Sequence, residues 1–144
     1  MRLTSMAKEE EVTRNLSVIE YYKQQLESLD IQMQYLQAAI VDAQKGKMTL
    51  EHIQKTAKNT DILIPVGGGA FVNGSVTTSS KILVGIGAGL VAEKTTEEAI
   101  LKIDERIKKL QENEEKLYGL AQKIQTDAQE LSVKTQKMME ETQA

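Results

Sequence analysis

The sequence predicts a mainly α-helical chain with a small β part: a long antiparallel α-helical coiled coil with two central β-hairpins that assemble into an oligomeric β-barrel hub. Three observations predict this fold. Both flanks repeat apolar residues every seven positions among Glu, Lys and Gln. Between Asp61 and Glu93 only Lys81 is charged. That same stretch holds seven of the nine glycines and the single proline, Pro65.

The first flank predicts a coiled-coil helix over residues 10–46. Its repeat consists of two series, Val12, Ile19, Leu26, Met33, Ile40 and Asn15, Tyr22, Leu29, Leu36, Ala43, in which only the asparagine is polar. Gly46 stands where such a helix would end. Residues 47–60 are predicted to form a short helix, capped by Thr49, and a linker. Residues 1–9 are expected to be disordered.

The central segment, residues 61–94, predicts two hairpins for oligomerisation. Runs rich in β-branched residues alternate with turn glycines and span Ile62–Val66, Ala70–Val76, Lys81–Ile86 and Leu90–Lys94. Glycine-rich reversals separate the strands of each pair. One signal conflicts with this interpretation, because Asn73-Gly74 inside the second run is itself a strong turn sequence. It marks either a turn or a bulge.

The last flank predicts the second coiled-coil helix over residues 95–140, followed by a tail at 141–144. One apolar series is Ile103, Leu110, Leu117, Ile124, Leu131, Met138, and the companion series Ile100, Ile107, Glu114, Ala121, Ala128, Thr135 weakens toward the C-terminus. Thr95 and Glu98 have the spacing of a capping box, which marks the helix start.

Neither helix can bury its apolar stripe alone, so the simplest partner is the other helix of the same chain. The short reversing linker favours this antiparallel arrangement over a parallel coil between chains. The hairpins have neutral, apolar strands whose edges need partners, which predicts an obligate oligomer. The residues expected to mediate oligomerisation are Ile62, Ile64, Val66, Phe71, Val76, Ile82, Val84, Ile86 and Val91.

The hairpin motifs, in this order between two coils, resemble the α-class subunit of prefoldin. The motifs are Ile62-Leu63-Ile64-Pro65-Val66-Gly67-Gly68-Gly69-Ala70-Phe71-Val72 and Ile82-Leu83-Val84-Gly85-Ile86-Gly87-Ala88-Gly89, with Glu93-Lys94-Thr95 opening the last helix. The resemblance covers roughly residues 10–140. It implies an ATP-independent holdase that assembles as two α and four β prefoldin subunits. It also implies that the coiled-coil ends hold unfolded client proteins for delivery to a group II chaperonin in the cytoplasm.

The free end of the coil is the candidate client-binding region. There the repeat thins at Asn15 and Thr135, and apolar residues appear outside it. The predicted client-binding residues are Val12, Leu16, Val18, Leu131, Val133, Met138 and Met139. Methionine is flexible and adapts to varied surfaces. Frayed helix ends would explain the same composition.

The other function classes find little support in the sequence. The chain has no cysteine, and His52 is its only histidine, so no metal or acid–base set is recognisable and no cofactor is expected. The glycines at 85, 87 and 89 lack the spacing of a nucleotide-binding loop. A net charge of −3 argues against nucleic acid, and no apolar run suits a membrane. The remaining alternative to a chaperone is a coiled-coil scaffold that binds no client.

Overall fold

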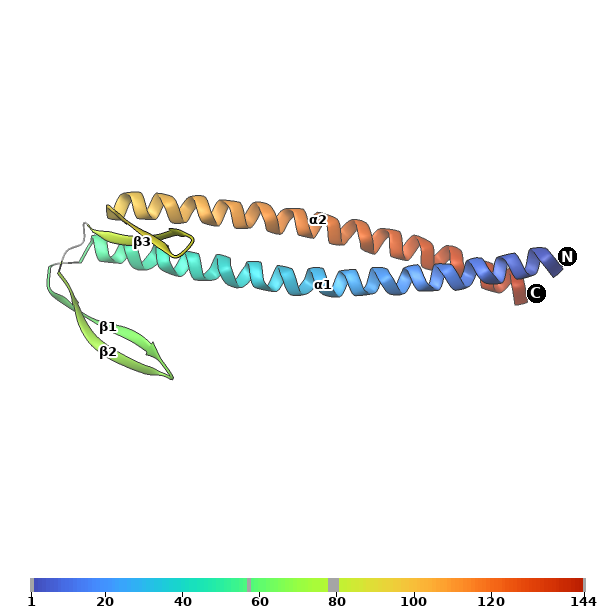
Figure 1. Cartoon of the computed structure of the whole chain (residues 1–144), viewed down its shortest axis with the longest axis horizontal. Helices are drawn as coiled ribbons and strands as arrows, with labels where there is room; N and C mark the ends of the chain where they lie inside the picture. Colours follow the sequence, from blue (N-terminus) through green and yellow to red (C-terminus); the bar gives the residue numbers. More distant parts are fainter. Residues whose placement is uncertain (1, 57, 78–80, 144) are drawn as a thin grey trace. The chain divides into compact units, whose positions relative to one another are not determined.

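The computed structural model describes residues 2–56, 58–77 and 81–143 and has the predicted fold class. Its elements, in chain order, are α1 (Arg2–Gln54), β1 (Thr60–Gly67), β2 (Ala70–Val76), β3 (Ile82–Gly87), β4 (Leu90–Lys94) and α2 (Thr96–Gln143) (Figure 1). The chain divides into two compact units. Unit 1 is Met1–Ala38 with Gln111–Ala144, and unit 2 is Ala39–Leu110.

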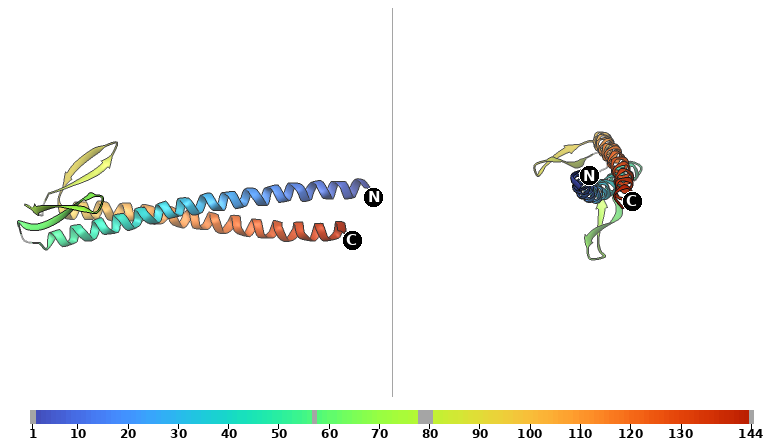
Figure 2. Two further views of the ribbon diagram at one scale, coloured as in Figure 1. Left: turned by 90° about the horizontal axis from the view of Figure 1, so that it is seen from below. Right: turned by 90° about the vertical axis from the view of Figure 1, so that its right-hand side faces the viewer.

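Unit 1 is an antiparallel pair of helical segments. The first turns of α1 lie beside the last turns of α2, drawn in blue and red (Figure 2). Ion pairs of 3.6 Å between Lys8 Nζ and Glu141 Oε2 and of 3.9 Å between Lys134 Nζ and Glu11 Oε1 join them. The predicted repeat faces inward, since Leu29 and Ile124 are buried. A helix that is apolar along one stripe buries that stripe against its partner.

Unit 2 contains a hydrophobic cluster to which both helices and the second hairpin contribute. Leu50 from α1, Val84 from β3 and Ala99 from α2 form a buried cluster. Partly buried Ile82, Ile100 and Ile103 pack against that cluster. The second hairpin is therefore attached to the helices by side chains on one face of β3.

The two helices predicted before the hairpins are one continuous helix. α1 begins at Arg2 and runs through Gly46 to Gln54. Glycine costs a helix only about 1 kcal/mol relative to alanine, so contacts just beyond it can offset that cost. Lys47 Nζ lies 2.7 Å from Asp104 Oδ1, and Leu50 packs in the core. The hydrogen bond to Asp104 raises the pKa of Lys47 above its ordinary value.

The two hairpins are separate two-stranded antiparallel sheets, β1 with β2 and β3 with β4. Their strands lie within about two residues of the predicted runs. Gly68 and Gly69 turn the first hairpin with φ values of 59° and 76°, a region that glycine enters without steric cost. In each hairpin the register shifts one residue before the turn, between Pro65 and Gly67 and between Gly85 and Gly87.

Asn73-Gly74 is neither a turn nor a bulge. Both residues lie in regular register within β2, Asn73 opposite Leu63 and Gly74 opposite Ile62. A side chain at Gly74 would meet Ile64, because a Cβ there would lie 2.7 Å from the Ile64 Cδ1 atom. The glycine leaves room for an isoleucine on the diagonal position of β1.

The predicted capping box at the start of α2 is confirmed. The Glu98 amide donates to Thr95 Oγ1 at 3.2 Å, and the Thr95 amide donates to Glu98 Oε2 at 3.2 Å. We expect Thr95→Ala to lower the free energy of unfolding by about 1 kcal/mol. Denaturant unfolding of the full chain measures this loss. Thr95→Ser keeps the hydroxyl and serves as the control, and an equal loss in both variants would contradict the role of the cap.

Candidate functional site

The first hairpin exposes apolar side chains on both faces. Successive residues of a strand point to opposite sides, and directly opposed residues share a side. The register places Ile62, Ile64 and Val72 on one face and Leu63, Pro65 and Phe71 on the other. Each of these side chains is exposed. Strands with two apolar faces and open edges, uncharged from Ile62 to Val76, are a site for association with further strands.

The second hairpin has part of one face covered by its own chain. Val84 is buried against Leu50 and Ala99, and Ile82 packs against the same cluster. On the opposite face Leu83 is 73% exposed and Val91 is also exposed. Val84 was predicted to mediate oligomerisation, but it has almost no surface to offer a second chain. It belongs to the core of its own chain.

The predicted oligomerisation residues therefore fall into three groups. Exposed in this chain are Ile62, Ile64, Val66, Phe71, Ile86 and Val91; partly buried are Val76 and Ile82; buried is Val84. Sequence reasoning missed the exposed Leu63, Val72, Leu83 and Leu90. The prediction took mainly every second residue of each strand, which assumes one association face per strand. The residues in between are also apolar, and that pattern could have indicated the second face.

The residues predicted to bind clients also separate. Four of them lie outside the helix–helix seam and are exposed, and we call them the off-seam group: Leu16, Val18, Val133 and Met139. Val12, Leu131 and Met138 are partly buried at seam positions. Two exposed residues near the start of α1, Leu3 and Met6, escaped prediction. Residues 1–9 were expected to be disordered. The three-residue spacing between Leu3 and Met6, which places both on one side of a helix, therefore played no part in the prediction.

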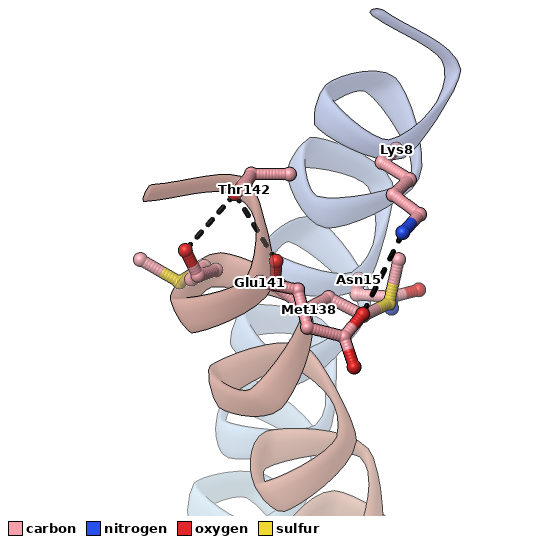
Figure 3. Close-up of polar contacts among 6 residues, drawn as sticks. Lys8, Asn15, Met138, Glu141 and Thr142 are labelled. Carbon is pink, nitrogen blue, oxygen red and sulfur yellow. Dashed lines mark hydrogen bonds and ion pairs between the residues drawn. The ribbon is translucent and has the colours of Figure 1, made fainter. Parts of the chain in front are cut away.

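Polar contacts hold the seam at this end of unit 1 (Figure 3). Asn15 Nδ2 donates to the sulfur of Met138 at 4.0 Å, with Lys8 and Glu141 paired close by. Thr135 is buried, and its hydroxyl donates to the Leu131 carbonyl at 2.6 Å. The buried hydroxyl is thereby satisfied within its own helix. Both polar residues of the seam thus have hydrogen-bond partners, and the off-seam group beside them keeps exposed apolar side chains.

Two other kinds of site were looked for among the described residues. Among them no three histidine, aspartate or glutamate side chains gather in a way that could hold a metal ion. No helix in the same ranges is both long and apolar enough to cross a membrane. His52 lies exposed in the last turn of α1.

Comparisons with known sequences find one family. A family model described as "Prefoldin subunit" matches residues 22–141. A prefoldin subunit alpha from Methanocorpusculum labreanum is 37% identical over 98 residues, which cover 68% of this chain and 67% of the relative. A prefoldin subunit alpha from Methanococcoides burtonii is 34% identical over 98 residues, covering 67% and 71%.

Solved structures agree with the fold described above. A chain of the filamentous PFD of Methanocaldococcus jannaschii, determined by cryo-EM, superposes with a TM-score of 0.73 at 26% identity. The match covers 81% of this chain and 97% of that one. The prefoldin beta subunit of Thermococcus strain KS-1 has a TM-score of 0.58 at 21% identity, covering 88% and 90%. The second likeness is one of fold alone.

Proposed function

Because the chain belongs to the prefoldin family, whose subunits are chaperones, we propose that it holds unfolded polypeptides in the cytoplasm without ATP and passes them to a group II chaperonin. The observation that carries this proposal is the off-seam group in unit 1. Leu16 and Val133 are 48% and 50% exposed beside the helix–helix seam. About half of each side chain is left uncovered by helix pairing, and an unfolded chain offers the apolar surface that would cover it.

The hairpins supply the assembly part of the proposed function. We propose that two copies of this chain and four prefoldin beta subunits join through their hairpins into a hexamer. The exposed faces of both hairpins support a strand-mediated hub. Each coil contributes weak apolar contacts, and several coils acting on one client raise the effective concentration of the contacts. This mode of action requires no catalytic residues.

Client capture should depend on the off-seam group. We expect the double variant Leu16→Ser, Val133→Ser to lose most of the protection that the assembled protein gives to a denatured model enzyme. Each substitution removes an apolar contact worth on the order of 1 kcal/mol, and the loss multiplies over the coils that hold one client. The measurement is light scattering after dilution of the denatured enzyme without nucleotide, with the partner subunit present.

Ile31→Ser is the matched control for this experiment. Ile31 is 54% exposed and also lies in unit 1 outside the seam, but it is far along α1 from the candidate client-binding region. Full protection by the Ile31 variant with loss in the double variant supports client binding by the off-seam group. Equal protection by all variants would reject that binding site. No protection even by the unaltered assembly would leave the alternative of a scaffold that only joins subunits.

A further inference from the structure

Met138 lies in the helix–helix seam of unit 1 and faces a hydrogen-bond donor. Asn15 Nδ2 donates to its sulfur at 4.0 Å, and both residues are partly buried (Figure 3). A thioether sulfur is a weak acceptor, so the contact contributes little to helix pairing in this form. Oxidation of methionine to its sulfoxide adds a polar oxygen to the sulfur. The Asn15 amide is therefore placed to donate to the oxygen of an oxidised Met138.

The separation of the two atoms fits that oxygen. A hydrogen bond between a nitrogen and an oxygen has a length of about 2.9 Å. The 4.0 Å between Asn15 Nδ2 and the Met138 sulfur leaves room for an oxygen on the sulfur, to one side of the line that joins the two atoms. Methionine has three rotatable side-chain bonds, so the sulfoxide can turn its oxygen toward the amide while the helices stay in place.

A second methionine of the seam lacks this arrangement. Met33 belongs to the seven-residue repeat of α1 and is also partly buried. Within residues 2–56, 58–77 and 81–143, no side chain donates a hydrogen bond to the Met33 sulfur. An oxygen there would lie in the seam without a donor, and methionine oxidation of that kind disrupts apolar cores. The chain thus contains two seam methionines that differ in the presence of a donor.

We propose that Met138 is a site of reversible oxidation, and that the Asn15 amide holds its sulfoxide in the seam. The oxidant is a peroxide. The sulfur attacks one oxygen of hydrogen peroxide, the sulfur–oxygen bond forms as the oxygen–oxygen bond breaks, and the second oxygen leaves as water with both protons. The sulfur is oxidised by two electrons and the peroxide is reduced. Methionine sulfoxide reductases reverse the change. This inference goes beyond the proposed function and does not depend on it.

The test treats the full chain with hydrogen peroxide and locates each sulfoxide by peptide mass spectrometry. Hydrogen exchange then reports helix pairing at residues 11–18 and 131–138. In the unaltered chain we expect Met138 to be converted while exchange in both segments stays as slow as in the reduced chain, or becomes slower. In Asn15→Leu, oxidation is expected to speed exchange there about tenfold relative to the reduced variant, because the seam then holds a polar group without a partner.

Two comparisons separate this site from the other methionines. Met138→Leu cannot be oxidised at this position, so peroxide should leave its exchange in the two segments unchanged. If its exchange rises as it does in Asn15→Leu, the opening begins at another methionine and the inference fails. Conversion of Met33 should speed exchange at residues 29–36 in every variant. Equal opening of the oxidised unaltered chain and the oxidised Asn15→Leu variant would overturn the inference, as would a Met138 that stays unoxidised after Met33 is converted.

Discussion

Replacing Val84 with lysine is expected to lower the free energy of unfolding of unit 2 by on the order of 3 kcal/mol. Val84 is only 7% exposed and packs with Leu50 and Ala99, a residue with no exposed surface at all. A lysine ammonium at that position would be buried without a partner unless the hairpin left the helices. Dilute full-length protein should show lower unfolding temperature and faster amide exchange at residues 82–94. Unit 1 should keep its exchange rates.

Leu83→Lys is the matched control, since it places the same charge on the adjacent residue of β3. Leu83 is 73% exposed on the opposite face, so its lysine remains in water. We expect the single chain to unfold as before in this variant. If both variants destabilise the chain equally, the packing of β3 on the helices is wrong. If neither does, Val84 is not a core residue.

Much of the fold follows from local signals in the sequence. The seven-residue repeats identify the inward face of α1 and α2, because a helix presents such residues on one stripe. The glycine-rich reversals locate both hairpins, and Thr95 with Glu98 marks the start of α2 through contacts three residues apart. These features depend on neighbours in the chain. They can be read without knowledge of the tertiary structure.

The errors concern positions where a distant residue decides the outcome. Gly46 would end an isolated helix, but Asp104 and the core beyond it extend α1 to Gln54. Gly74 looks like a turn residue, and its neighbour across the sheet, Ile64, explains it instead. Val84 has the same chemistry as the exposed strand residues. Only its packing against both helices reveals a structural role.

The candidate association surfaces also depend partly on local sequence and partly on distant contacts. Apolar character identified the hairpins as association sites, yet it could not tell which face of each hairpin is already covered. β3 uses one face for its own chain, whereas β1 and β2 expose both faces. The first hairpin therefore has more apolar surface to give to other subunits than the second. A charge placed on it should affect assembly more than stability.

Leu63→Lys is accordingly expected to abolish assembly while leaving the single chain folded. Leu63 is 64% exposed and shares a face with Phe71, so its lysine is harmless in the isolated chain. Inside a strand-mediated hub the same lysine would be desolvated without a partner. A cost of a few kcal/mol weakens each interface on the order of a hundredfold. Light scattering at a concentration where the unaltered chain assembles should then report the 16.0 kDa of one chain.

Leu101→Lys tests whether any exposed leucine would have this effect. Leu101 is 63% exposed and lies in unit 2, but it is on α2 and outside both hairpins. The substitution changes side-chain volume, charge and exposed area as Leu63→Lys does, so only the location differs. Normal assembly of the Leu101 variant and loss in the Leu63 variant would assign association to the first hairpin. If the Leu63 variant assembles normally, the face of the first hairpin that carries Leu63 and Phe71 is not buried between subunits.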